Sequence, residues 1–120
     1  MERLITAHFV KDFDLGQNGN LYGGRMLDWL DEAGALFVHG LFRDSCFVTW
    51  KIGETIFHRA IKHKTIVEIY VDNVEVRTSS VGFDLTAKVN GEEVLTTSMV
   101  FVCIDPATGV KRPIDTKAEA

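Results

Sequence analysis

The stretch Asn18–Gly34, NGNLYGGRMLDWLDEAG, begins the one long helix that the sequence predicts. From Gly23 to about Leu41, apolar residues recur at the three- and four-residue spacing of an amphipathic helix. Placed at steps of 100° around the axis, they form a stripe that needs another element to cover it. Asp28, Glu32 and His39 fall on the far side of the helix. The stripe itself consists of Met26, Leu27, Leu30, Ala33, Gly34, Phe37, Val38 and Leu41.

Most of the remaining chain is predicted to be strand. Val, Ile, Thr and aromatic residues dominate segments that are separated by polar or glycine-bearing turns. Asn90-Gly91 lies between two of these segments and indicates a hairpin, because both residues tolerate positive φ. The predicted strands are Leu4–Val10, Cys46–Phe57 with a break near Gly53, Thr65–Val76, Val81–Val89 and Val94–Ile104, with a loop over Lys11–Asn20 and a frayed tail over Thr116–Ala120.

One amphipathic helix and a meander of long strands predict an α+β fold in a single domain, residues 1–120. The helix has to lie across one face of an antiparallel sheet of about five strands, since nothing else in the chain can cover its stripe. A single helix cannot cover both faces of such a sheet. We therefore expect a second chain to cover the rest, in a homodimer at minimum.

Composition and charge exclude several function classes. The chain is 46% apolar and carries 17 acidic against 13 basic residues, a net charge of -4, which argues against general binding to nucleic acid or to an anionic membrane. The N-terminus has no apolar signal region, so we expect a cytoplasmic protein in which Cys46 and Cys103 are reduced. No Cys and His residues have metal-ligand spacing, and no metal site is predicted.

Two features of the helix carry the chemistry. Asp31 falls at the margin of the apolar stripe, so it either borders the core as a structural residue or serves as a partly desolvated functional carboxylate. Gly23-Gly24 at the helix start either forms a turn that needs positive φ or leaves backbone N–H groups open to a ligand. Such N–H groups, together with the positive end of the helix dipole, suit a developing oxyanion.

These residues resemble the signature of the hotdog-fold acyl-CoA thioesterases, in particular the brain acyl-CoA hydrolase and YciA-like group. That signature is Asp-x-Asn-x-x-Gly-x-x-Phe-Gly-Gly followed by a helix that carries Asp or Glu. The resemblance covers most of the chain and implies a hotdog fold, in which the sheet wraps around one long helix. It further implies hydrolysis of an acyl-CoA thioester and assembly as a trimer of dimers. No cofactor is implied, because coenzyme A is part of the substrate.

The resemblance also implies roles for individual residues. Asp31 matches the catalytic acidic residue, which acts as general base or nucleophile from the neighbouring subunit. Gly24, with Gly23, matches the turn whose N–H polarises the thioester carbonyl. The family's Asn falls at Gly16, a departure from the pattern, and Asn18 either replaces it from a shifted position or only shapes the turn. Asp14 matches the leading Asp.

Candidate coenzyme A contacts follow from the same resemblance. They are Arg59 after the second long strand, the turn Arg77-Thr-Ser-Ser with Ser79 and Ser80, and Lys111 and Arg112 in the tail. A basic residue taken alone is more often a solvated surface group. The segment after Arg59, Ala60–Thr65, also departs from the Pro-x-x-x-Gly-Asp of the family.

Two other functions compete with hydrolysis. A non-catalytic domain that binds or senses acyl-CoA would keep the glycines and would not need Asp31. A hotdog dehydratase would need a histidine before the helix, and His8, His39, His58 and His63 do not stand there. The acyl chain is not predicted, although Leu21, Tyr22, Trp29, Trp50 and Phe57 are candidate walls of its tunnel.

Overall fold

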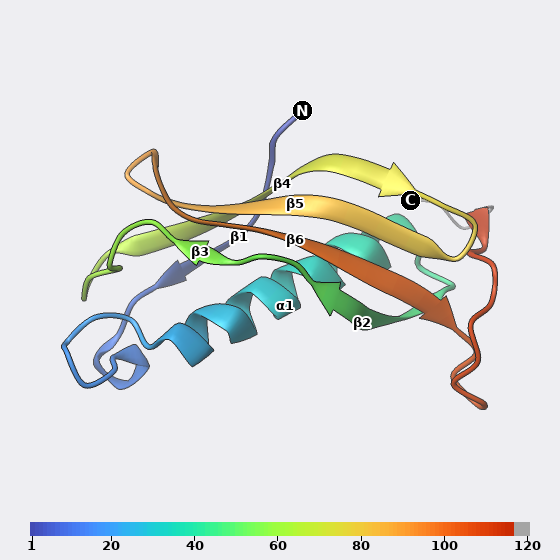
Figure 1. Cartoon of the computed structure of the whole chain (residues 1–120), viewed down its shortest axis with the longest axis horizontal. Helices are drawn as coiled ribbons and strands as arrows, with labels where there is room; N and C mark the ends of the chain where they lie inside the picture. The colour runs from blue at the N-terminus through green and yellow to red at the C-terminus, as the bar shows by residue number, and fades with distance from the viewer. Residues whose placement is uncertain (117–120) are drawn as a thin grey trace.

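The computed structural model describes residues 1–116, so residues 117–120 of the predicted tail lie outside it. Within the described part, one long helix, α1 (Gly23–Leu41), lies across a single antiparallel sheet, and a 3-10 turn forms over Asp12–Asp14 (Figure 1). The strands are β1 (Arg3–Phe9), β2 (Cys46–Ile52), β3 (Ile56–Phe57), β4 (Ile66–Val76), β5 (Ser80–Val89) and β6 (Glu92–Ile104).

The strand order β1-β4-β5-β6-β2 confirms the α+β class and the five long strands. The short β3 also pairs with β6, so β2 and β3 lie one after the other along the same side of β6. The break near Gly53 separates them as predicted. Asn90 and Gly91 both adopt positive φ, 53° and 80°, which confirms the hairpin between β5 and β6. The predicted loop over Lys11–Asn20 additionally contains the 3-10 turn.

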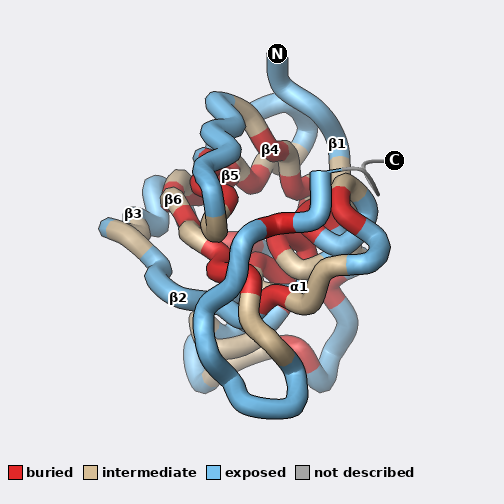
Figure 2. The backbone as a smooth tube through the Cα atoms, turned by 90° about the vertical axis from the view of Figure 1, so that its right-hand side faces the viewer, coloured by how far each residue is buried: buried red, intermediate tan, exposed pale blue. Residues whose placement is uncertain are grey.

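The core lies between α1 and the inner face of the sheet (Figure 2). Alternate residues of β4 and β5, such as Val67 and Leu85, are fully buried there, as the period of two in a strand requires. Phe83 links the two layers, because its ring packs edge-on against Phe37 of α1 at 5.2 Å and stacks with Phe101 of β6 at 5.9 Å. None of the helices among the described residues is long and apolar enough to span a membrane.

The buried side of α1 differs from the predicted stripe at its two margins. Leu27 was expected in the stripe but is exposed, whereas Trp29 was left out and is buried. Trp29 stacks flat on His8 of β1, with ring centroids 4.4 Å apart. Edge strand β1 therefore covers the Trp29 margin of α1. Leu27 lies on the opposite margin and is 39% exposed.

Candidate active site

The N-terminus of α1 presents unbonded backbone N–H groups. The first hydrogen bond of the helix runs from the N–H of Met26 to the C=O of Tyr22 at 3.1 Å, and Tyr22 supplies no side-chain cap. Within residues 1–116, the N–H groups of Gly23, Gly24 and Arg25 have no acceptor. The first turn contains no acidic residue to compete for them. An anionic group can therefore meet both free donors and the positive end of the helix dipole here.

A close contact explains Gly24, and positive φ explains neither glycine. Neither Gly23 nor Gly24 has a positive φ, so the alternative of a strained turn is wrong. A Cβ on Gly24 would lie 2.5 Å from Cε2 of Tyr22, whose ring covers this turn. A Cβ on Gly23 would have Cζ of Phe57 as its nearest neighbour, at 3.8 Å. A side chain at position 24 would therefore displace the Tyr22 ring, whereas one at position 23 would make only an ordinary van der Waals contact.

Asp31 is half-buried on the side of α1 that faces β2, as its place beside the stripe predicts. The hydroxyl of Thr49 on β2 donates a hydrogen bond of 2.6 Å to its Oδ1. A bond to an ionised acceptor is stronger than one between neutral groups and fixes the direction of the carboxylate. Asp31 is thus oriented by the strand and still open to water, as a proton acceptor or nucleophile has to be.

Exposed apolar residues follow the edge of the sheet next to Asp31. We call them the apolar rim. Each is at least 42% exposed, and they lie on β2 and β3, whose outer edge has no strand partner among the described residues (Figure 1). A run of large apolar side chains along an unpaired strand is typical of an interface with another chain. The apolar rim consists of Val48, Trp50, Ile52, Ile56 and Phe57.

Gly24 and Asp31 lie on the same side of α1 but apart along its axis. They are seven positions apart in the sequence, and the helical rise places them about 10 Å apart. The carbonyl of one thioester accepts a hydrogen bond at about 3 Å, and its carbon has to lie at a similar distance from the attacking atom. At this spacing Asp31 is too far away to attack directly a thioester carbonyl that Gly24 of the same chain polarises.

The loop before α1 is closed by its own backbone. The N–H of Gly16 donates to the C=O of Asn20 at 2.8 Å, and Gly19 has a φ of 75°. Asn18 lies exposed at the tip of this loop. Asp14, in contrast, is only 3% exposed and lies 3.2 Å from Nε of Arg25 in the first turn of α1. Sequence reasoning gave Asp14 a place in a motif but no partner.

The candidate coenzyme A residues fall at two ends of the sheet. Arg77 belongs to the β4–β5 turn, and the C=O of Ser79 accepts a hydrogen bond from the N–H of Cys103. The N–H of Arg112 donates to the C=O of the same Cys103, so the segments of Ser79 and Arg112 both lie beside Cys103. Ser80 and Lys111 are the sequence neighbours of these two residues. Arg59 lies at the opposite end, near the β5–β6 hairpin, where it pairs with Glu92 at 2.9 Å.

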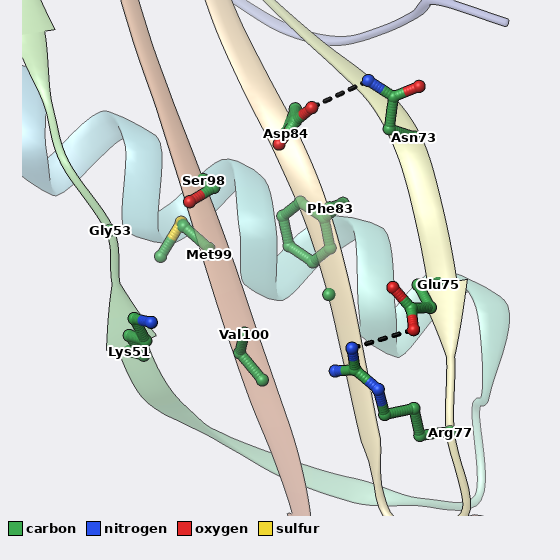
Figure 3. Close-up of a pocket in the computed structure, with 11 residues that line it drawn as sticks. Lys51, Gly53, Asn73, Glu75, Arg77, Phe83, Asp84, Ser98, Met99 and Val100 are labelled. Atoms are coloured by element: carbon green, nitrogen blue, oxygen red, sulfur yellow. Dashed lines mark hydrogen bonds and ion pairs between the residues drawn. The ribbon is translucent and has the colours of Figure 1, made fainter.

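A cavity of about 180 Å³ lies beside Arg77 on the outer face of the sheet. Figure 3 shows its polar side chains in front of the strands, with α1 behind them. Arg77 pairs with Glu75 at 2.8 Å, and Asp84 accepts a hydrogen bond from Asn73. The sheet separates this cavity from the inner face, where Thr49 meets Asp31. Within one chain the cavity and the candidate catalytic residues are therefore separate.

The candidate tunnel residues form a buried group and an exposed group. Leu21 and Trp29 are part of the core, whereas Tyr22, Trp50 and Phe57 are exposed. Only the exposed three are free to contact a ligand or a second chain in the conformation described.

His8 is the histidine most enclosed by the core. Burial lowers the pKa of His8 from its usual 6.5, against the opposing charge of Glu32, whose Oε1 lies 3.9 Å from Nε2. Lys11 lowers the pKa further and Asp14 raises it. In residues 1–116, no three His, Cys, Asp or Glu side chains gather as metal ligands would. Cys46 and Cys103 are free thiols.

Comparisons with known proteins agree with this architecture. The chain superposes on a variant of HI0827, a hexameric broad specificity acyl-coenzyme A thioesterase, with a TM-score of 0.88 and 20% identity over 98% of this chain and 89% of that one. It superposes on Cj0915, a hexameric hotdog fold thioesterase of Campylobacter jejuni, with a TM-score of 0.83 and 20% identity over 96% and 92%.

A third similar structure is an acyl-CoA hydrolase from Staphylococcus aureus in complex with butyryl coenzyme A and coenzyme A. Its TM-score is 0.80 at 17% identity, over 94% of this chain and 68% of that one. No curated protein matches the sequence. The family model of the thioesterase superfamily matches residues 18–100, which include the whole of α1 and most of the sheet. The chain therefore folds as a hotdog domain and belongs to the thioesterase superfamily.

Proposed function

We propose that this protein hydrolyses an acyl-CoA thioester to the free acid and coenzyme A. The observation that carries the proposal is the pairing of two groups on one helix. The free N–H of Gly24 suits an oxyanion, and Asp31 is held in place by Thr49 while it remains open to water. Membership of the thioesterase superfamily and the likeness to acyl-CoA hydrolases support this choice of reaction.

The active site is shared between two subunits. Gly24 of one chain and Asp31 of its partner act on the same thioester, because the two groups of one chain lie about 10 Å apart. The apolar rim supports this arrangement, since it lies on the free edge beside Asp31 and a second copy that pairs there would bury it. We propose a homodimer at minimum and a trimer of dimers as the complete assembly, by likeness to the hexameric thioesterases.

Two chemical routes are open at Asp31. As a general base, its carboxylate takes a proton from water while the water oxygen bonds to the carbonyl carbon. Gly24 N–H then stabilises the oxyanion, the C–S bond breaks, and the thiolate leaves and takes up a proton. As a nucleophile, the carboxylate itself bonds to the carbonyl carbon, expels the thiolate and forms an anhydride that water hydrolyses. In both routes the thiolate is a good leaving group, so no strong general acid is needed.

Coenzyme A supplies phosphates that need cations or N–H donors. We propose Arg77, Ser79, Ser80 and Arg112 as one such group, because hydrogen bonds of the main chain bring their segments together. Arg59 would contribute from the other end of the sheet, nearer the start of α1. The reaction requires no cofactor in this scheme. We propose a cytoplasmic location, where acyl-CoA substrates and reduced cysteines occur together.

The test is the activity of Asp31→Asn against a panel of short, medium, long and aromatic acyl-CoAs. The amide keeps the size of the side chain and still accepts a bond from Thr49, but it cannot take a proton. If Asp31 is the base, kcat should fall roughly 100- to 10,000-fold, the usual worth of a positioned proton acceptor. The assembly should still form and still bind a non-hydrolysable acyl-CoA analogue.

Asp28→Asn is the matched control, because Asp28 is an exposed carboxylate of the same helix. It should retain the parent activity. If Asp31→Asn also retained it, Asp31 would be a structural residue at the border of the core. If the parent bound acyl-CoA but hydrolysed none of the panel, the protein would be a binding domain instead.

A further inference from the structure

Asp14 is the one charged residue that is buried among residues 1–116, at 3% exposure. A carboxylate taken out of water is costly unless charges and hydrogen bonds compensate it. The catalytic scheme above makes no use of Asp14, and its place is the 3-10 turn before the helix rather than the sheet core. The position of this carboxylate therefore needs a reason of its own.

Asp14 makes three contacts, two of which reach the start of α1. Its Oδ2 accepts a hydrogen bond of 2.8 Å from the N–H of Lys11, which fixes the side chain within its own turn. Its Oδ1 lies 3.2 Å from Nε of Arg25 in the first helical turn. Its backbone C=O accepts a hydrogen bond of 2.9 Å from the N–H of Tyr22, the residue just before the helix. Asp14 thus holds the residues on both sides of Gly23-Gly24.

The loop between these contacts reinforces the connection. Leu15 and Leu21 form an isolated antiparallel bridge, so the chain leaves Asp14 and returns beside it. The N–H of Leu21 donates to the C=O of Ile61 at 2.7 Å, which ties the returning segment to the body of the domain. The Asp14 contacts therefore hold Tyr22 and Arg25, the two residues that flank the glycine pair.

Charge adds a second effect. A lone carboxylate near a helix N-terminus would oppose an oxyanion that binds to the same N–H groups. Arg25 cancels that charge locally. Its buried Nε–H has no acceptor in line with it among the described residues, so the contact is an ion pair rather than an aligned hydrogen bond. The pair therefore fixes the turn without leaving net negative charge beside it.

We propose that Asp14 and Arg25 form a positioning pair that aims the N–H of Gly24 at the thioester oxygen. The proposal rests on the function proposed above and adds a residue that the family signature marks without a role. A merely structural Asp14 would lower the melting temperature only. A positioning Asp14 lowers kcat at temperatures where the variant is fully folded.

The experiment compares Asp14→Asn with Asp28→Asn, which removes the exposed carboxylate 3.8 Å from the same Arg25. Asp14→Asn keeps an acceptor for the N–H of Lys11 but loses the charge. Because misplacing a catalytic group by about 1 Å costs on the order of 100-fold, kcat should fall about 10- to 100-fold. KM should stay unchanged, since the lost interaction forms only in the transition state. Asp28→Asn should match the parent in both constants.

Arg25→Lys provides a second variant, because it keeps the positive charge and should restore part of the kcat that Arg25→Ala loses. The proposal is overturned if Asp14→Asn, folded at the assay temperature, has a kcat within twofold of the parent. A parent that hydrolyses no acyl-CoA would refute the proposed function but not the positioning role.

The positioning role would then be tested by the ¹⁵N order parameter of the Gly24 amide. This order parameter should drop in Asp14→Asn and not in Asp28→Asn. An unchanged order parameter would contradict the positioning role.

Discussion

Gly34→Ala should lower the stability of the protein, because a side chain at this position would push α1 away from the sheet. Gly34 is buried in the middle of the helix, where the backbone crosses the aromatic layer of the sheet. A Cβ placed there would lie 2.6 Å from Cε1 and 3.0 Å from Cζ of Phe101, and 3.3 Å from Sδ of Met99. The Phe101 ring cannot withdraw easily, since it is 2% exposed and stacks on Phe83.

Two opposing effects decide the size of the change. Replacing Gly by Ala in a helix interior contributes up to about 1 kcal/mol in favour of folding. Overpacking a close-packed core typically costs about 1–3 kcal/mol. A contact of 2.6 Å is far inside van der Waals distance, so the overpacking lies at the upper end. We expect a net loss of about 1–2 kcal/mol, and a melting temperature lower by about 3–10 °C.

Gly40→Ala is the control, because it lies on the same helix and a Cβ there meets nothing within 4 Å. It should hold or raise the melting temperature. Both variants are measured by thermal unfolding at one protein concentration, because the melting temperature of an oligomer depends on concentration. If Gly34→Ala were as stable as Gly40→Ala, the close approach of α1 to β6 would be wrong.

Three further outcomes are expected. The lowered pKa of His8 means that the unfolded chain binds a proton first, so stability should be full above about pH 6.5 and fall as the pH drops below it; His8→Phe should flatten that fall in melting temperature between pH 5 and 8. Ala at Arg59, Arg77 or Arg112 should raise KM and leave kcat nearly intact, as lost uniform binding does; unchanged KM in all three would remove the nucleotide assignment. Trp50→Glu should place a charge in the apolar rim and dissociate the assembly into smaller species; if the variant sedimented as the same oligomer as the parent, that would count against an interface there.

The fold was predictable because its signals are local. The helical period and the glycines place α1 at Gly23–Leu41, and Asn90-Gly91 places the hairpin. Strand ends moved by only one or two residues, since pairing with a neighbour extends or trims a strand in ways that its own residues do not encode. Leu27 and Trp29 were misassigned because steps of 100° place Leu27 inside the stripe and Trp29 outside it, whereas burial depends on which neighbouring element lies beside each residue. The stack of Trp29 on His8 of β1 is a contact between separate elements, and the helical period does not predict it.

The site was predictable in part for a different reason. Asp31 and the glycine pair lie on one helix, so their relation follows from the helical geometry. The bond from Thr49 to Asp31 and the pair of Asp14 with Arg25 join residues from separate elements. Neither follows from periodicity. The buried carboxylate could have been suspected only from its place in the motif.

The central claim is that one active site uses Gly24 of one subunit and Asp31 of another. Subunit complementation tests it most directly. Gly24→Pro removes the N–H of Gly24 in the first turn of the helix, where the missing N–H breaks no helical hydrogen bond, and its Cβ also displaces the Tyr22 ring from the same half of the site. Asp31→Asn removes the proton acceptor. Each variant alone should be nearly inactive. The two are unfolded, mixed in equal amounts and refolded, and the thioesterase activity of the mixture is measured.

A mixed dimer contains one site in which both groups are intact and one in which both are lost. Random pairing makes half of the dimers mixed, so the mixture should recover about a quarter of the parent activity per subunit in a twofold-symmetric dimer. If Gly24 and Asp31 of the same chain acted together, every site would lack one of them. A refolded mixture with no more activity than the separate variants would contradict the shared site.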